Sequence, residues 1–451
     1  MIPFFQEIKN KLDVVSPSFC IAKWKTLTLH LGLGENHSCY HPPMHKIDPV
    51  AIKTDPSALH NTEHKKKVRK LMLEGIRPDE CNYCWHIEDL SGNQASDRVR
   101  HSSSPDMFGE LDKISSSAFD VNINPSWLEL SFSNHCNFRC SYCGPGASSR
   151  WRDEIQKFGG YPVRNDAQGN GPEALHKQYK EEENPYIEAF WRWWPDLYPD
   201  LRTLRITGGE PMMTTGYFKI FDYALEHPNK ELSFNVNTNL GVPTKTISKF
   251  IDIAQRLEES GNVKSIGLFT SIDTSGEAAE YIRNGLVNED YYKHLKMIMD
   301  AVPNIEVSFM ITFGPLSLFN FTELLDFIVT LREQYPNNKI GIGIAVLNYP
   351  SHFDLKILPD KFQPWFDKIT AHFENQMNKW PQHEKDYWKT LLTHWETTKD
   401  NNPKGHLEDR IDFYRFFKEH DLRRKTSIIL SVPEIEEFYL ECEELSYARN
   451  Y

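Results

Sequence analysis

The sequence predicts an α/β protein built on a partial (β/α)6 TIM-like barrel, preceded by a small cysteine-ligated module and followed by a helical C-terminal extension. Two observations favour the barrel. Six short β-prone runs recur between residues 125 and 350, and helix-length amphipathic segments separate most of them. Strands that alternate with helices form parallel βαβ units. Six units are too few to close an eight-stranded barrel, so we expect an open one.

The predicted elements follow one another in a regular order. The β-prone runs are 127–132, 201–206, 232–237, 266–272, 305–311 and 340–347, and the helical segments are 217–227, 245–259, 277–300 and 320–335. The gap at 133–200 is too long for a simple crossover. It holds a polar insert, GGYPVRNDAQGNGPE, and an aromatic helix, YIEAFWRWWPDLYPDL. The insert is interpreted as a lid or substrate loop, with a tolerated surface insertion as the alternative.

The domain organisation follows from these patterns. We assign residues 1–100 to a loop-rich module with four cysteines, 101–124 to a serine-containing linker, 125–350 to the barrel and 351–451 to the helical extension. Within the module, the segment HKKKVRKLMLEGIRP is predicted to be a helix that Gly75 and Pro78 end. Its basic run, 64–70, is interpreted as a solvated helix face rather than a nucleic-acid site.

Composition and charge exclude several classes of protein. The 451 residues carry a formal net charge of −12, which argues against a general nucleic-acid binder because such affinity depends on Lys and Arg. No apolar run is long enough for a membrane span, and the N-terminal MIPFFQEIKNKLD lacks the apolar core of a signal peptide. We therefore expect a cytoplasmic protein with reduced thiols. Its eight cysteines are too few for a disulfide scaffold.

Three of these cysteines stand in the segment SNHCNFRCSYCGPG, directly after the first barrel strand. Cys136, Cys140 and Cys143 have the spacing C-x3-C-x2-C. Three thiolates on one short loop can bind three corners of a [4Fe–4S] cluster and leave one iron open for a substrate or cosubstrate. A structural zinc ion would need a fourth ligand, and His135 is poorly placed for that role because it adjoins Cys136.

Polar residues and glycines follow the later strands. The second strand leads into TGGEP (207–211), which predicts a tight turn with exposed backbone groups. The carboxyl ends of parallel barrel strands share one rim, so the polar residues at those ends should face the cysteine loop. They are Asn237, Thr238, Asn239, Ser271, Asp273 and, in the following helix, Arg283.

The cysteine loop resembles the signature of radical S-adenosylmethionine (SAM) enzymes, in which an aromatic residue, here Tyr142, precedes the third cysteine. The resemblance implies a partial barrel and a [4Fe–4S] cluster that binds SAM. It also implies that the turn at 207–211 binds the amino group of SAM, because the family's segment is matched by Gly208, Gly209, Glu210 and Pro211. The resemblance further implies that the ribose and the carboxylate of SAM are held by Asn239, Ser271 and Arg283. Many relatives have Gly after the residue that matches Asp273, whereas this chain has Thr274.

Four other cysteines lie before the barrel. Cys81 and Cys84 form a two-thiolate clip, CNYCW, and Cys20 and Cys39 would supply two more ligands for an iron–sulfur cluster or a zinc ribbon. The segments FCIAKW, CYHP, KVRKLMLEG and PDECNYCWHIED resemble a twitch or half-SPASM module, which implies a second, auxiliary [4Fe–4S] cluster. Relatives often read Cys-Cys where this chain has Cys39-Tyr40. The remaining Cys442 is expected to be a buried structural thiol.

The resemblance implies an activity and leaves the substrate open. A cluster reduced by an external one-electron donor, such as flavodoxin or ferredoxin, would cleave SAM to a 5′-deoxyadenosyl radical that abstracts hydrogen from the substrate. The auxiliary cluster would accept an electron or shape the substrate pocket. Oxidation or epimerisation of a small molecule or sugar is the leading expectation, because no peptide-leader-binding domain is recognisable. Modification of a peptide (RiPP-type) or of RNA is the alternative, and a non-catalytic iron–sulfur or zinc protein is the second one.

Overall fold

The computed structural model describes residues 3–90, 95–164, 179, 181–398 and 403–448. Within these ranges the strands form a single sheet in the order β3-β2-β1-β4-β5-β6-β7-β8-β9. The last six pair in parallel: β4 (Trp127–Ser131), β5 (Thr203–Thr207), β6 (Asn229–Thr238), β7 (Val263–Ser271), β8 (Glu306–Phe313) and β9 (Ile340–Val346). They coincide with the six β-prone runs, so the predicted open barrel of parallel strands is confirmed.

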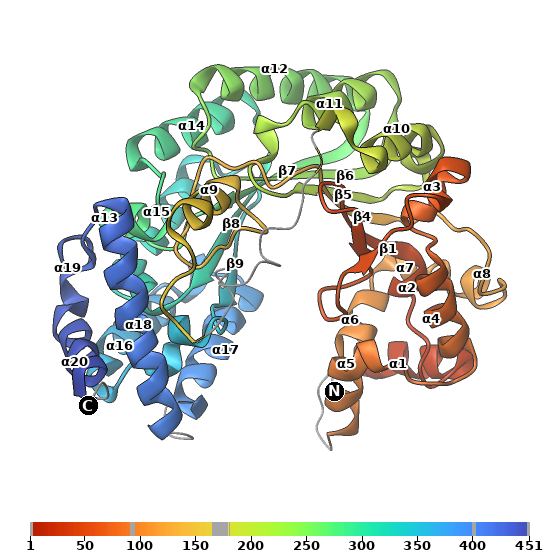
Figure 1. Ribbon diagram of the computed structural model, residues 1–451. Coiled ribbons are helices and arrows are strands. Elements are labelled where there is room, and N and C mark those ends of the chain that lie inside the picture. Colours follow the sequence, from red (N-terminus) through yellow and green to blue (C-terminus); the bar gives the residue numbers. More distant parts are fainter. Residues whose placement is uncertain (1–2, 91–94, 165–178, 180, 399–402, 449–451) are drawn as a thin grey trace.

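Helices between these strands cover the outer face of the sheet (Figure 1). They are α11 (Thr215–Glu226), α12 (Thr244–Ser260), α13 (Gly276–Ile282), α14 (Asn288–Ala301) and α15 (Phe321–Gln334). Along β8 every second side chain is buried, including Phe309 and Ile311, because the apolar face packs under the helices. The intervening positions face the barrel interior. The helix expected at 277–300 is split into α13 and α14 by a loop in which Gly285 has φ 117°.

The long segment between β4 and β5 contains the expected aromatic helix, α10 (Pro185–Leu197), and a helix after the cysteine loop, α9 (Ser149–Phe158). Asn184 begins α10, because its side chain accepts hydrogen bonds from the backbone N–H groups of Tyr186 and Ile187. The helix buries its aromatic side chains, among them Trp193 and Trp194, against the barrel. Most of the polar insert, 165–178 and 180, lies outside the described residues.

The N-terminal part extends the barrel sheet, which the sequence analysis did not predict. β1 (Thr26–His30) pairs in parallel with β4, and β2 (Glu35–His37) and β3 (His45–Lys46) continue in antiparallel order. The accompanying helices are α1 (Pro3–Val15), α2 (Ala22–Lys25), α3 (Ala51–Thr54), α4 (Glu63–Leu73), α5 (Asn82–Asp89), α6 (Asp97–Ser102), α7 (Pro105–Phe108) and α8 (Leu111–Ser115). The segment interpreted as a linker, 101–124, therefore contains short helices.

The helix α4 corrects the interpretation of its basic run. Lys65 and Arg69 are buried rather than solvated. Lys65 Nζ donates to the carbonyl of Thr26 at 3.1 Å, and Arg69 Nε donates to the carbonyl of Lys23 at 3.0 Å. These cations satisfy backbone oxygens next to β1, so only the remaining basic residues of the run face solvent.

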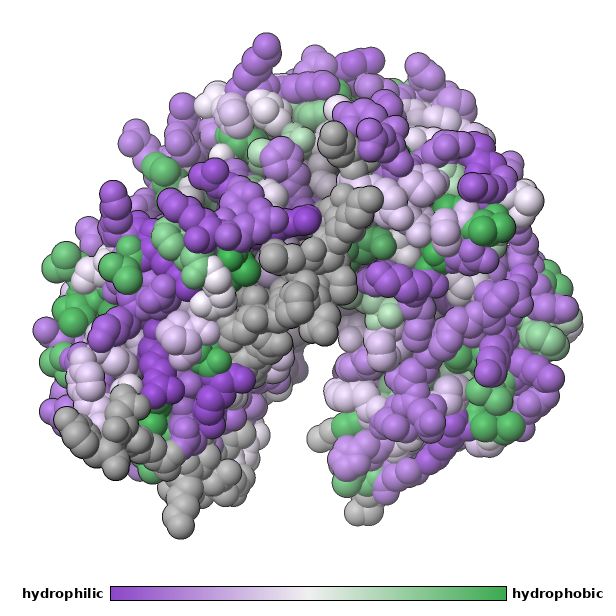
Figure 2. Space-filling model, viewed as in Figure 1, coloured by the Kyte–Doolittle hydropathy of each residue, from purple (hydrophilic) through white to green (hydrophobic). Residues whose placement is uncertain are grey.

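The C-terminal part is helical, as expected, with α16 (Gln363–Asn375), α17 (Gln382–Thr398), α18 (Pro403–Arg424), α19 (Ile428–Ser431) and α20 (Glu436–Ala448). It lies at the opposite end of the sheet from the N-terminal module, and the space-filling view shows the molecule hollowed between the two (Figures 1 and 2). Cys442 is fully buried among these helices. No helix in the described ranges is long and apolar enough to cross a membrane.

Candidate active site

The cysteine loop leaves the carboxyl end of β4 and is fastened to the loop that separates α13 from α14. The backbone N–H of Arg139 donates to the carbonyl of Asn284 at 2.8 Å, and that of Ser141 donates to the carbonyl of Ile282 at 2.7 Å. Ser148 closes the loop: its hydroxyl donates to the carbonyl of Phe138 at 2.7 Å and it caps α9. These bonds hold Cys136, Cys140 and Cys143 on one side of the barrel opening.

Cys136 is buried, and Cys140 and Cys143 are half-buried. Burial and the neighbouring thiols raise the pKa of Cys136 and Cys143 to about 12, and burial raises the pKa of Cys140. Such thiols lose their protons when a metal binds them. Two polar side chains already contact the sulfurs, because Asn239 Nδ2 lies 4.0 Å from Cys136 Sγ and Arg283 Nη1 lies 3.8 Å from Cys140 Sγ. The residues present therefore fit a cluster with three cysteine ligands.

The carboxylate of Asp273 organises this side of the loop. It is fully buried and accepts hydrogen bonds from the Tyr142 hydroxyl at 2.9 Å, from Arg283 Nη2 at 2.9 Å and from the backbone N–H of Thr312 at 2.8 Å. The structure thus brings together Tyr142 and Arg283, which the sequence analysis expected near SAM. Ser271 is the last residue of β7 and is half-buried on the same rim. The absence of a glycine at Thr274 does not disturb this arrangement.

The turn at 207–211 packs directly on the cysteine loop. Gly208 has φ 119°, which favours glycine, and a Cβ atom on Gly209 would lie 2.2 Å from the carbonyl oxygen of His135. The backbone N–H groups of Gly209 and Glu210 donate to the carbonyls of Ser133 at 3.1 Å and His135 at 2.7 Å. The two glycines are therefore required by the close approach of two backbones.

Glu210 anchors this turn to the end of β6. Its buried carboxylate accepts hydrogen bonds from Met212 N at 3.1 Å, Thr238 Oγ1 at 3.0 Å and Asn239 N at 2.8 Å. Burial nevertheless raises its pKa to about 7. Pro211 opens the short 3-10 helix Pro211–Met213 that follows. Glu210 therefore positions the turn by binding the end of β6.

The four N-terminal cysteines meet in a second place. Cys20, Cys39 and the pair Cys81 and Cys84 come from three separate segments of the chain and line one cavity. Burial raises the pKa of all four thiols, to about 12 for Cys81 and Cys84. Positive groups stand beside them, since Lys23 and Arg98 also line the cavity. The backbone N–H of Arg98 donates to Cys84 Sγ at 3.3 Å.

A pocket of about 940 Å³ lies between the two groups of cysteines. Its wall includes Tyr40, which follows Cys39, and Gly144, which follows Cys143. Gly208 contributes from the glycine turn. Polar side chains from adjacent strands form its floor: His30 and Glu35 from β1 and β2, then Glu129, Arg205 and Asn237 from β4, β5 and β6.

Hydrogen bonds order the floor of this pocket. The Tyr40 hydroxyl donates to Glu129, so the N-terminal module and the barrel interior are joined there. Arg205 Nε donates to Asn237 Oδ1 at 2.8 Å, and its guanidinium carbon lies 4.8 Å from the centroid of the Phe269 ring. Glu129 and Arg205 are not among the predicted site residues. The only signal for them in the sequence is the alternation of polar and apolar positions in WLELS and TLRIT, and the register of β4 against β5 pairs the two residues.

Comparisons with known proteins bear on this site. Residues 130–328 match the family model of the Radical SAM superfamily. No curated protein matches the sequence. Similar solved structures are those of Streptococcus suis SuiB alone, bound to S-adenosylmethionine, and bound to precursor peptide SuiA. In that order, their sequence identities to this chain are 14%, 15% and 14%. The matched part covers 78%, 78% and 79% of this chain and 68%, 69% and 70% of the SuiB chain. The TM-scores are 0.31, 0.34 and 0.35.

Proposed function

We propose that this chain, a radical SAM enzyme by its domain at residues 130–328, binds a [4Fe–4S] cluster and SAM at the barrel opening and acts on a polar substrate in the adjacent pocket. A cluster held by Cys136, Cys140 and Cys143 would supply the electron for reductive cleavage of SAM, which would enable hydrogen abstraction from the substrate. The observation that carries this proposal is the shared wall of the pocket, to which the cysteine loop contributes Gly144 and the glycine turn contributes Gly208.

The chain's own residues have separate parts in this site. Cys136, Cys140 and Cys143 ligate the cluster, and the backbone of Gly208 and Gly209 cradles the amino group of SAM. Asn239 and Arg283 contact cysteine sulfurs, so we assign them to orienting the cluster and its SAM. Glu210 fixes the turn from behind through Thr238 and Asn239. Ser271 stays a proposed contact to SAM because it ends β7 on the same rim.

We infer a second [4Fe–4S] cluster on Cys20, Cys39, Cys81 and Cys84, in a twitch-type module. Their common cavity supports one shared ligand. The spacing of the sulfurs favours a cluster over zinc: cysteine sulfurs around one zinc ion lie about 3.8 Å apart, given Zn–S bonds of about 2.3 Å. In the described part of the chain, no three of these cysteine sulfurs lie within 4.8 Å of one another, so they stand too far apart to surround one zinc ion. A cubane carries its four thiolates on separate corners and needs the wider spacing.

The pocket favours a small, polar substrate. Its volume of about 940 Å³ lies near the upper end of the range of about 300–1,000 Å³ for small-molecule sites, so SAM and a second small molecule can share it. Glu35 and Glu129 on its wall disfavour a polyanion such as RNA. The position between two clusters suits an oxidation in which the auxiliary cluster takes up an electron. Epimerisation of a small molecule or sugar, or modification of a peptide, would use the same site. Identification of the product distinguishes these reactions from an oxidation.

The test is anaerobic reconstitution followed by two assays. The protein should bind about eight iron atoms, from two cubanes, and should release 5′-deoxyadenosine from SAM once a reductant is added. The triple substitution of Cys136, Cys140 and Cys143 by Ala should remove about four irons and all release. Replacement of Cys81 and Cys84 by Ala should remove the other four and leave SAM cleavage. Retained SAM cleavage without the loop cysteines would refute the assignment.

A further inference from the structure

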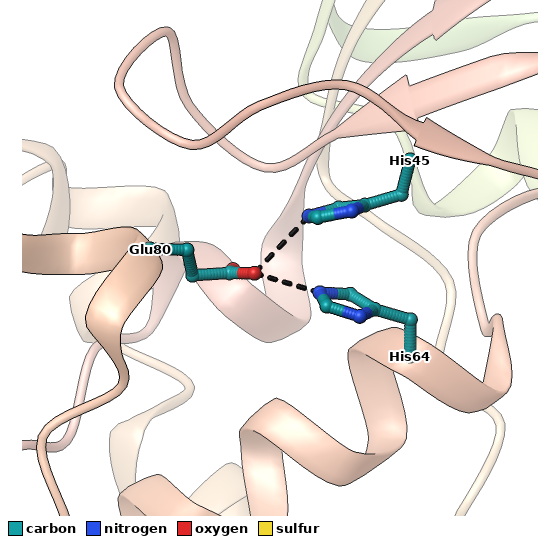
Figure 3. A group of neighbouring side chains, drawn as sticks. All are labelled: His45, His64 and Glu80. Carbon is teal, nitrogen blue, oxygen red and sulfur yellow. Dashed lines mark hydrogen bonds and ion pairs between the residues drawn. The ribbon is translucent and has the colours of Figure 1, made fainter.

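Three side chains outside the pocket converge in the N-terminal module: His45 from β3, His64 from α4 and Glu80 from the short 3-10 helix Asp79–Cys81 (Figure 3). His64 Nε2 lies 2.6 Å and His45 Nε2 3.1 Å from Glu80 Oε2. Their ligand atoms all lie within 4.8 Å of one another, and in the described part of the chain this is the only such group of three His, Cys, Asp or Glu residues. Figure 3 shows both imidazoles directed at the same carboxylate oxygen.

Hydrogen bonding alone does not account for this arrangement. One imidazole, His64, hydrogen-bonds to Glu80. The other, His45, has its Nε2 buried 3.1 Å from the same oxygen, within ion-pair distance but without the geometry of a hydrogen bond. The two rings lie with centroids 3.6 Å apart, which disfavours charge on both. Burial and the neighbouring His64 lower the pKa of His45, and a neutral imidazole nitrogen is the form that ligates metals.

The second oxygen of Glu80 is held in place by Lys23, whose ammonium group pairs with Oε1. Ligating carboxylates in proteins commonly have such an outer partner, which fixes their orientation. Oε1 is thus occupied by a protein group, while Oε2 faces the two imidazoles.

We propose that His45, His64 and Glu80 bind one Zn²⁺ ion, with water as the fourth ligand. Two imidazoles and a carboxylate form a ligand set that zinc takes in tetrahedral geometry, whereas Mg²⁺ and Ca²⁺ prefer oxygen ligands alone. The side chain of His64 is 42% exposed, so an ion can enter from solvent. A zinc ion here would tie β3 and α4 to the segment that carries Cys81. This site is independent of the radical chemistry proposed above.

The test uses the full chain after anaerobic reconstitution with iron and sulfide, so that the cysteines are occupied. The protein is dialysed against Zn²⁺, and zinc and iron are counted by mass spectrometry. We expect about one zinc per chain in addition to the iron. The variants H45Q and H64Q, whose amide can still donate to Glu80, should bind zinc at least tenfold more weakly and keep their iron. The control H227Q replaces an exposed histidine of the barrel and should bind zinc as the unmodified chain does.

A second readout separates binding at this site from adventitious zinc. Zinc should raise the thermal unfolding midpoint of the unmodified chain and of H227Q, and it should leave those of H45Q and H64Q unchanged. Equal zinc in the unmodified chain and both variants would overturn the proposal. Zinc that is taken up only as iron is lost from the protein would also overturn it, because the metal would then belong to the thiols.

Discussion

Arg283 joins Cys140 to Asp273. Its Nη1 atom lies 3.8 Å from Cys140 Sγ, and its Nη2 atom lies 2.9 Å from Asp273 Oδ1. Both charged side chains are buried. A fixed positive charge beside a cluster ligand stabilises the more negative, reduced cluster and so raises its reduction potential. Because Asp273 also binds the Tyr142 hydroxyl, one carboxylate orients both the cation and the aromatic residue of the cysteine loop.

Replacing Arg283 by Met should therefore lower the reduction potential of the SAM cluster. It should also cost about 3–5 kcal/mol of stability, because Asp273 is left buried without its cation. The double variant R283M/D273N should recover much of that stability, and its potential should lie above that of R283M because the negative charge of Asp273 is removed as well. An EPR-monitored redox titration measures the potential, and urea unfolding measures the stability. An unchanged potential in R283M would contradict this role.

The buried carboxyl of Glu210 should make stability depend on pH. Its pKa is raised from 4.5 in the unfolded chain to about 7 in the folded one. Between these values the folded chain holds a proton that the unfolded chain releases, so stability falls as pH rises. The loss should reach about 3 kcal/mol by pH 7 and then level off.

The variant E210Q provides the comparison, since an amide does not titrate. Between pH 5 and 7 the thermal midpoint of the unmodified chain should fall relative to that of E210Q. E210Q itself should be less stable overall, by about 1–3 kcal/mol, because its amide N–H₂ faces a backbone donor. Parallel pH profiles for the two proteins would show that Glu210 does not titrate in this range.

The C-terminal extension reaches the cysteine loop through Arg424. Its Nε atom pairs with Glu154 Oε2 at 3.0 Å, and its Nη1 donates to the carbonyl of Arg139 at 2.6 Å. Both charged side chains are fully buried. We expect R424M to destabilise the protein by about 3–5 kcal/mol, because the buried carboxylate of Glu154 loses one of the positive charges that neutralise it. We also expect a loss of about four irons, since the loop that holds the SAM cluster loses this support.

Iron per chain and urea unfolding measure both effects. The matched control is K418M on the same helix, where the lysine contacts tyrosine hydroxyls at the surface, and it should change neither quantity. If R424M kept about eight irons, the extension would be only a stabilising cap on the barrel.

Local periodicity explains how much of this fold the sequence predicts. The six parallel strands and their rim follow from alternating β-prone and helical segments, and each is recognisable within about ten residues. β1 is different: its five residues pair with β4 about a hundred positions later, and no local pattern reports that partner. For the same reason, the burial of Lys65 and Arg69 could not be predicted, because the local sequence around them indicates a solvated basic helix face.

The candidate site divides in the same way. The cysteine triplet and the glycine turn are short motifs that the sequence shows directly, and their proposed chemistry follows from the resemblance to radical SAM enzymes. Glu129 and Arg205 are ordinary polar positions in their own strands, and only the register of β4 against β5 places them together. The group of His45, His64 and Glu80 requires three elements to meet, so no spacing in the sequence indicates it. The pocket floor and this group form only when distant segments of the chain fold together.

Gly209 provides the sharpest test of the SAM site. A Cβ atom there would lie 2.2 Å from the carbonyl oxygen of His135, so G209A must push the turn off the cysteine loop. The bonds from Gly209 N and Glu210 N to that loop would break with the shift. We expect SAM affinity to fall at least tenfold, which corresponds to about 1.4 kcal/mol. The N-terminal cysteines lie elsewhere, so their iron should be retained.

Equilibrium binding of SAM to the anaerobic holoenzyme measures this loss, and G343A serves as the matched control. Gly343 is also a barrel residue, but a Cβ atom there would approach nothing closer than 3.6 Å, which is ordinary contact. G343A should bind SAM as the unmodified chain does. If G209A bound SAM equally well, the turn would be a simple strand-to-helix connection, and the amino group of SAM would have to be held by other residues of the rim.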